Sequence, residues 1–407
     1  MTSDYYSSAG REVLWNVNSP VNQVVLYALF VLSMAVCLNG LVIRIALWSK
    51  GKPDTTRFNN IPHRFTLFWE YVLRQRKVNE DPEARVFHQF LFLGFLVLLF
   101  TTTMVFIDND LGIKIYHGRF YLLVTLYSDV FGLFLIFGTG IAYYRRVFAR
   151  PDNLHTTRSD FLLLGILALL CIQGFILEGL RIYVTNDQWK YFSPVGYLFS
   201  LGFWGLSLNS AAVLHFIVWW LHAILVFVFI ALLPYTKFMH VLTSSANLFF
   251  QRTTRPKGAL SYPGNIESLL EAAAESESGD FSIGVSNIQD LTWKQRLDLD
   301  SCTSCGRCQD VCPAYSSGKP LSPKWLILDT RNHLLKLTTN ESLVNASQTV
   351  PLRKQVDATL LQNLLLSPEP TGKDSGPLSI RAANPMVQNS VRSIGGSPLA
   401  TLAGDVM

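Results

Sequence analysis

Residues 212–236 decide the fold, because they read AVLHFIVWWLHAILVFVFIALLPYT and contain no charged side chain. A helix of about 20 apolar residues crosses the hydrocarbon core of a bilayer. Four further stretches are expected to span a membrane in the same way: 22–47, 87–107, 120–144 and 160–184. The stretch 192–206 is apolar but short and rich in glycine, and we expect it to be re-entrant or interfacial.

These stretches predict a membrane-embedded, all-α bundle of five helices, followed by a small α-helical, ferredoxin-like domain that is incomplete. We expect the bundle in residues 1–250, a polar linker with one short helix at 251–295, and the small domain at 296–407. Within the last domain, a helix is expected at 323–336 and an apolar patch at 358–366.

The composition agrees with a membrane protein. The 407 residues are 49% hydrophobic and 15% charged, whereas about 25% of residues are charged in soluble domains. The net charge of +5 is small for this length and does not indicate nucleic acid as a partner. The first apolar run is too long for the core of a cleavable signal peptide.

The basic residues predict the orientation, because Lys and Arg are concentrated in cytoplasmic loops. The loop 49–86 carries eight of them and the loop 145–159 carries four, whereas the opposite connections carry few. We therefore expect the N-terminus outside and everything after about residue 237 in the cytoplasm. Residues 63–82 are expected to form either a helix on anionic lipid or an ordinary connecting helix.

Four cysteines form a compact run, Cys302-Thr-Ser-Cys305-Gly-Arg-Cys308-Gln-Asp-Val-Cys312-Pro313. The pattern C-x2-C-x2-C-x3-C-P is typical of bacterial ferredoxins and predicts a [4Fe-4S] cluster. Zinc is the alternative, but its cysteines usually come as two separated pairs. In two-cluster ferredoxins the fourth cysteine of such a run serves the other cluster, so Cys312 closes either this cluster or a second one.

Two histidines are expected at the same membrane depth. His88 follows the cytoplasmic start of the second span, and His240 follows the cytoplasmic end of the fifth. Two neutral imidazoles on different helices can hold a haem iron axially; the alternative is a pair of unrelated interfacial histidines.

His222 precedes His240 by 18 residues, which is five helical turns or about 27 Å. It therefore shares a helical face with His240 and is a candidate for a second haem. Its partner is left open: His117 is one option, whereas His215 is on the same helix and cannot reach across. Glu178 and Arg181, three residues apart, are expected to form an ion pair, with a quinone site as the less favoured alternative.

Residues 22–250 resemble the haem b membrane subunit of respiratory nitrate reductase. That family has five spans, an external N-terminus and a histidine pair on the last span spaced like His222 and His240, and His88 matches the cytoplasmic-side histidine of its second span. The other second-span histidine would fall near Leu98, where none is present. The resemblance therefore implies one haem b, held by His88 and His240, more strongly than two.

The segment from Leu291 through Pro323, which contains the cysteine run, resembles heterodisulfide-reductase-related Fe-S oxidoreductases. The fusion of both halves is similar to the membrane-bound electron-transfer-flavoprotein:menaquinone oxidoreductases. This resemblance implies a quinone-linked oxidoreductase in which electrons pass from electron-transfer flavoprotein through [4Fe-4S] and haem b to menaquinone. Because such proteins continue into a second cysteine run and CCG domains, we expect this chain to be C-terminally truncated.

Two other functions remain open. The chain is alternatively a haem and Fe-S membrane anchor that connects a separate catalytic subunit, as in a heterodisulfide-reductase-like complex. A weaker third hypothesis is a membrane-tethered Fe-S redox sensor without haem.

Overall fold

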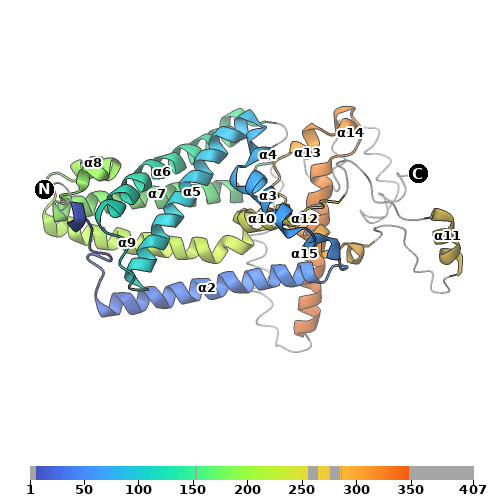
Figure 1. Ribbon diagram of the computed structural model, residues 1–407, viewed down its shortest axis with the longest axis horizontal. Helices are drawn as coiled ribbons and strands as arrows, with labels where there is room; N and C mark the ends of the chain where they lie inside the picture. Colours follow the sequence, from blue (N-terminus) through green and yellow to red (C-terminus); the bar gives the residue numbers. More distant parts are fainter. Residues whose placement is uncertain (1–5, 152–153, 255–264, 276–284, 286, 348–407) are drawn as a thin grey trace. The chain divides into compact units, whose positions relative to one another are not determined.

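The computed structural model describes residues 6–151, 154–254, 265–275, 285 and 287–347 (Figure 1). Within these ranges the protein is helical and contains no β-strand, only an isolated bridge between Lys52 and Thr292. Residues 1–38, 76–151 and 158–233 form one compact unit, here unit 1, and residues 39–75, 152–157 and 234–407 form unit 2. The apolar patch expected at 358–366 lies outside the described residues.

Five helices are long and apolar enough to cross a membrane, which confirms the expected number of spans: Pro20–Ser49, Pro82–Asn109, Gly118–Ala149, Arg158–Thr185 and Leu208–Tyr235. Many of their large apolar side chains are exposed, including Val31, Leu99 and Leu221. Lipid is the solvent that such surfaces require, and a helix satisfies all its backbone groups internally. The chain is therefore a multi-pass membrane protein.

Unit 1 contains most of this bundle. Its helices are the first part of α2 (Pro20–Ser49), α4 (Arg76–Asn79), α5 (Pro82–Asn109), α6 (Gly118–Tyr144), α7 (Arg158–Thr185), α8 (Pro194–Leu201) and α9 (Leu208–Leu232). Single turns complete it: η1 (Tyr6–Ser8), the π-helical η4 (Arg145–Ala149), η5 (Lys190–Phe192) and the start of η6 (Leu233–Tyr235). The stretch expected to be re-entrant or interfacial forms η5 and α8, which are too short to span a bilayer.

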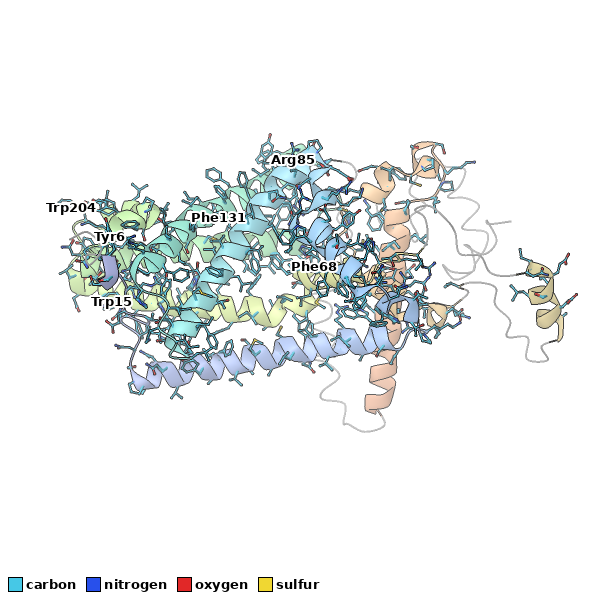
Figure 2. The ribbon with its side chains drawn as sticks, in the orientation of Figure 1. Tyr6, Trp15, Phe68, Arg85, Phe131 and Trp204 are labelled. Carbon is cyan, nitrogen blue, oxygen red and sulfur yellow. The ribbon has the colours of Figure 1, made fainter. Side chains whose placement is uncertain are left out.

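Helices α5 and α6 pack closely because glycines lie at their contact. A Cβ atom on Gly94 would lie 2.8 Å from the Phe131 carbonyl oxygen, and one on Gly138 would lie 2.9 Å from that of Phe87. Small residues permit such close approach between membrane helices. Phe131 itself lies on α6 with its ring 4.9 Å from that of Phe134 (Figure 2).

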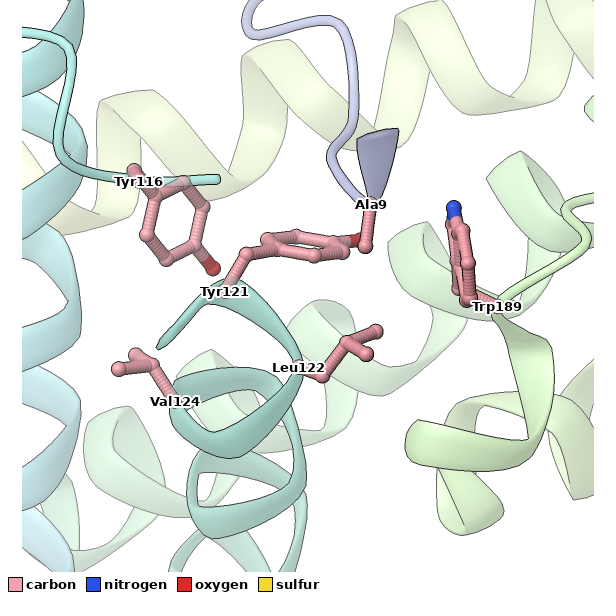
Figure 3. Packing of buried hydrophobic residues seen from close by; sticks show 6 residues of the cluster. All are labelled: Ala9, Tyr116, Tyr121, Leu122, Val124 and Trp189. Atoms are coloured by element: carbon pink, nitrogen blue, oxygen red, sulfur yellow. The ribbon is translucent and has the colours of Figure 1, made fainter. Parts of the chain in front are cut away.

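A buried aromatic cluster joins the N-terminal segment to the α6 and α7 ends of unit 1 (Figure 3). The rings of Tyr116 and Tyr121 meet edge to face at 5.1 Å, an arrangement that aromatic quadrupoles favour. The same cluster is completed by Ala9, Leu122, Val124 and Trp189.

Unit 2 contains the end of α2 and a set of shorter helices: η2 (Thr55–Phe58), α3 (Ile61–Phe68), the π-helical η3 (Trp69–Leu73), η7 (Lys237–Met239), α10 (His240–Phe249), α11 (Ile266–Glu275), η8 (Ile288–Asp290), α12 (Trp293–Asp300), α13 (Arg307–Asp310), α14 (Pro313–Ser316) and α15 (Pro323–Ser347). The helix expected at 323–336 is therefore present and extends to Ser347. The expected short linker helix is α11.

A fully buried arginine holds the middle of unit 2 together. Arg64 has an exposed fraction of 0%, and its guanidinium donates to the carbonyl oxygens of Phe249 at 2.9 Å and Gln251 at 2.7 Å. It also donates to Asn59 and Thr56. The expected single helix over 63–82 is wrong, because α3 runs into a π-helical turn and Gln75, at φ 50°, interrupts the chain before α4.

Candidate functional site

The four cysteines lie on one loop, whose geometry follows from its local sequence. Helix α12 begins with a capping box between Thr292 and Gln295 and ends just before Cys302. Ser304 and Gly306 then adopt positive φ values of 62° and 81°, a conformation that glycine favours. The chain therefore turns sharply between Cys302 and Cys308, which bends the loop back on itself.

The thiols of the cysteine loop influence one another. Burial raises the pKa of Cys308, and the neighbouring Cys302 and Cys305 raise it further, so these three groups interact. All four cysteines of the run are free. Nowhere in the described ranges do three or more His, Cys, Asp or Glu residues converge as ligands of one metal ion.

Hydrogen bonds attach the cysteine loop to the rest of unit 2. Asp300, two residues before Cys302, accepts from Arg44 Nη1 at 3.2 Å and from Trp48 Nε1 at 3.1 Å, both on α2. Ser301 Oγ donates to the Thr243 carbonyl oxygen on α10 at 3.0 Å. No local pattern indicates these contacts, because the partners are separated by 58 to 256 residues.

His240 is oriented as a metal-binding histidine would be. It begins α10, and its Nδ1 lies 2.5 Å from the Lys237 carbonyl oxygen. Such a bond places the proton on Nδ1 and leaves Nε2 as the nitrogen that can bind iron. Burial lowers the pKa of His240, which favours the neutral imidazole that a haem requires. The residue therefore fits the axial role expected of it.

His88 lies on α5, with its ring 6.4 Å from that of Phe87. It belongs to unit 1 and His240 to unit 2, so their pairing on one haem stays a prediction. His222 lies on α9, and its buried Nδ1 has no hydrogen-bond partner in the described part of the chain. An orphaned imidazole nitrogen of this kind is compatible with a bound group.

The helical register between His222 and His240 differs from expectation. Helix α9 ends at Leu232, and the turns η6 and η7 separate it from α10. Pro234 lies in this break, where its missing N–H and its ring stop a helix. The two histidines therefore lie on different helices, and a five-turn spacing does not place them on one face.

The other two histidines considered for an outer haem differ: His117 stays a prediction, whereas His215 has local partners. His117 occupies the position before α6 in extended conformation, at φ −145°. His215 is buried, and its Nδ1 lies 3.5 Å from the Asn16 amide nitrogen while Trp15 packs edge-on at 4.7 Å. His215 is thus a satisfied core residue.

The expected ion pair between Glu178 and Arg181 is wrong. Arg181 Nη1 instead contacts Asp187 Oδ2 at 2.6 Å, because the chain reverses after α7 and brings Asp187 back to the helix end. Glu178 instead accepts from Ser193 Oγ, just before α8, at 2.8 Å.

Asp129 is the polar residue in a span that sequence reasoning missed. It is 2% exposed on α6 and accepts from the backbone N–H groups of Val195 and Gly196 at the start of α8, at 2.6 and 3.4 Å. The signal was available, since an acidic residue inside a membrane helix is costly and is usually functional.

Comparison with known proteins agrees with both halves. Residues 83–255 match the family described as the nitrate reductase gamma subunit, and residues 293–314 match a 4Fe-4S binding domain. No solved structure is significantly similar.

The curated relatives are redox proteins. The chain is 34% identical to the EtfAB:quinone oxidoreductase of Syntrophomonas wolfei over 76% of this chain and 43% of that protein. It is 29% identical to the "Probable iron-sulfur-binding oxidoreductase FadF" of Bacillus subtilis over 67% of this chain and 37% of that protein. It is 26% identical to one subunit of the dihydromethanophenazine:CoB–CoM heterodisulfide reductase of Methanosarcina barkeri, over 43% of this chain and 62% of that subunit.

The chain thus spans about two fifths of the length of the first two relatives. It joins a membrane region similar to the nitrate reductase gamma subunit to a 4Fe-4S binding segment. It is related to membrane oxidoreductases of the iron–sulfur and haem type, which include quinone oxidoreductases and heterodisulfide reductase subunits.

Proposed function

We propose that this protein transfers electrons from a reduced cytoplasmic donor, electron-transfer flavoprotein, through a [4Fe-4S] cluster and haem b to menaquinone. The proposed location is the bacterial cytoplasmic membrane, with the N-terminus outside and the cysteine loop in the cytoplasm. The donor and the quinone are suggested by the name of the Syntrophomonas relative, an EtfAB:quinone oxidoreductase.

The hydrogen bond from Ser301 to Thr243 carries the proposal. Ser301 is the neighbour of Cys302 in the chain, and its Oγ lies 3.0 Å from the Thr243 carbonyl oxygen. Thr243 is three residues after His240, about 4.5 Å along the helix axis. A cysteine of the cluster motif and a candidate haem ligand therefore lie on segments in direct contact within unit 2, which supports a short electron route between them.

In this proposal Cys302, Cys305 and Cys308 hold the cluster, with Cys312 serving this cluster or a second one. His240, held by the Lys237 carbonyl, and His88 hold haem b, and His222 is a candidate ligand of a second haem. When bound, the two groups supply one-electron redox chemistry. The chain itself fixes the imidazole orientation and attaches the cysteine loop to α2 and α10.

The haem is tested by a dithionite-reduced minus air-oxidised visible spectrum of membranes containing the full chain. A b-type signal is expected in the wild type and should disappear in His88→Ala and His240→Ala. His63→Ala, an exposed histidine on α3, is the matched control and should retain it. Retention of the full signal in both axial variants, with the protein present, would remove His88 and His240 as the haem ligands, whereas a wild-type protein without any b-type signal would remove the haem assignment and favour an Fe-S sensor.

The donor and acceptor need a separate assay. Membranes with the protein should couple oxidation of reduced electron-transfer flavoprotein to reduction of a menaquinone analogue. Cys305→Ser should abolish this coupling, because a cluster ligand is lost. A wild-type preparation that contains cluster and haem but shows no coupling would disprove the donor and acceptor assignment.

A second candidate is a membrane anchor that connects a separate catalytic subunit. The observation in its favour is the match to 62% of a heterodisulfide reductase subunit, a relative that is by name one component of an enzyme. Mild-detergent purification from native membranes tests it. A stoichiometric catalytic partner would favour the anchor, and its absence together with donor-to-quinone coupling would exclude it.

A further inference from the structure

A buried lysine lies against the cysteine loop. Lys324, in the first turn of α15, is 3% exposed. On either side of it along the chain, Ser322 bonds to Gln309, the neighbour of Cys308, and Arg331 bonds to the Cys302 carbonyl oxygen. Burial lowers the pKa of Lys324, and three thiols of the cysteine loop oppose that effect. The lysine is thus a buried residue on the part of α15 that is attached to the cysteine loop.

The start of α15 is attached to the helix that bears Cys308. Ser322 Oγ donates to Gln309 Oε1 at 2.6 Å, and both side chains are almost completely buried. Ser322 Oγ also accepts from the Trp325 backbone N–H at 3.4 Å. The Lys324 ammonium lies 5.2 Å above the Trp325 ring. These contacts hold the ammonium in place beside the loop.

A second cation near the loop, Arg331, has its charge partly offset by a neighbouring carboxylate. Arg331 donates to the Cys302 carbonyl oxygen at 3.0 Å, but it also interacts with Asp300. Asp300 is a buried carboxylate that offsets part of the arginine's charge. The acidic neighbour of Lys324 is Asp310, which is exposed, so water screens its charge more effectively.

We propose that Lys324 sets the reduction potential of the cluster: its buried ammonium stabilises the added electron and makes the cluster a better acceptor. This inference rests on the proposed [4Fe-4S] site. Reduction adds one electron to the cluster and removes one from the reduced donor, and no bond or proton is exchanged. Net charge around the sulfurs is one of the protein's means of tuning such potentials.

The test is an EPR-monitored redox titration of the full-length protein in membranes. Lys324→Met removes the charge and keeps the length of the side chain. Its midpoint is expected to be more negative by about 59 mV or more, equivalent to a tenfold weaker one-electron reduction. Lys324→Arg, which keeps the charge, should stay near the wild type. Lys319→Met, which removes an exposed charge five residues upstream, should shift the midpoint much less.

The outcomes separate this inference from the proposed function. A wild-type protein without a [4Fe-4S] signal would disprove the proposed function itself. A native cluster signal in Lys324→Met with a midpoint like that of Lys319→Met would overturn the role of Lys324 alone. Lys324→Gln is a second neutral variant in case the first loses its cluster. Cluster loss in both would show that Lys324 holds the loop rather than sets its potential, and would also overturn the proposal.

Discussion

Asp300→Asn tests how the cysteine loop is attached to membrane helix α2. The Arg44 and Asp300 side chains are only 10% and 9% exposed, and Asp300 also accepts the Trp48 indole proton at 3.1 Å. Breaking a buried ion pair by removing one partner costs about 3–5 kcal/mol. Asparagine keeps one acceptor oxygen but leaves the Arg44 charge uncompensated. We therefore expect the free energy of local opening to fall by about 3 kcal/mol, which raises the open population roughly 100-fold.

Hydrogen–deuterium exchange of the detergent-solubilised protein measures this opening directly. The amides of α12 should exchange roughly 100-fold faster in Asp300→Asn, whereas Glu271→Gln, which removes an exposed carboxylate on α11, should leave them unchanged. The double variant Arg44→Met/Asp300→Leu should recover much of the loss, because apolar replacement of a buried pair is often neutral. Equal exchange in Asp300→Asn and Glu271→Gln would refute the reasoning.

Three further substitutions test the packing by thermal unfolding in detergent. Gly138→Leu should lower the free energy of unfolding by about 1–3 kcal/mol because it overpacks the α5–α6 contact. Gly140→Leu, where a Cβ meets nothing within 4 Å, should leave it unchanged. Equal destabilisation by both variants would contradict the close α5–α6 contact. Arg64→Met should lower the free energy of unfolding by at least about 3 kcal/mol, since it leaves several buried carbonyl groups without a donor. An unchanged thermal midpoint would contradict this role of Arg64. Arg181→Met should lower the free energy of unfolding by about 3–5 kcal/mol, because it leaves the Asp187 carboxylate buried without its cationic partner. A thermal midpoint equal to that of the wild type would show that the ion pair is energetically neutral.

The spans and the cysteine run were predictable because their signals are local. Hydropathy over 20 residues determines whether a helix can cross a bilayer, and the spacing of Cys302 to Cys312 lies within one loop. The helix break before His240 was readable as well, since Pro234 stops α9. The prediction that His222 and His240 share a helical face assumed one continuous helix and overlooked this break.

The contacts that build the site were not predictable, because they join residues far apart in the chain. Ser301 and Thr243 are separated by 58 residues, and nothing in either local sequence specifies the other. Glu178 was assigned to Arg181 from a three-residue spacing, yet its hydrogen-bond partner is Ser193, just before α8. Helical spacing shows which pairs can meet, but the tertiary fold determines which of them do.

The bond that orients His240 has a consequence for how this site tolerates genetic change. Its acceptor is the main-chain oxygen of residue 237, which every amino acid provides, so no replacement of the Lys237 side chain removes it directly. A search for covarying side-chain partners of His240 would therefore miss its orienting group. Mutations that disturb the turn η7, such as an insertion between residues 237 and 240, are the ones expected to misdirect the imidazole.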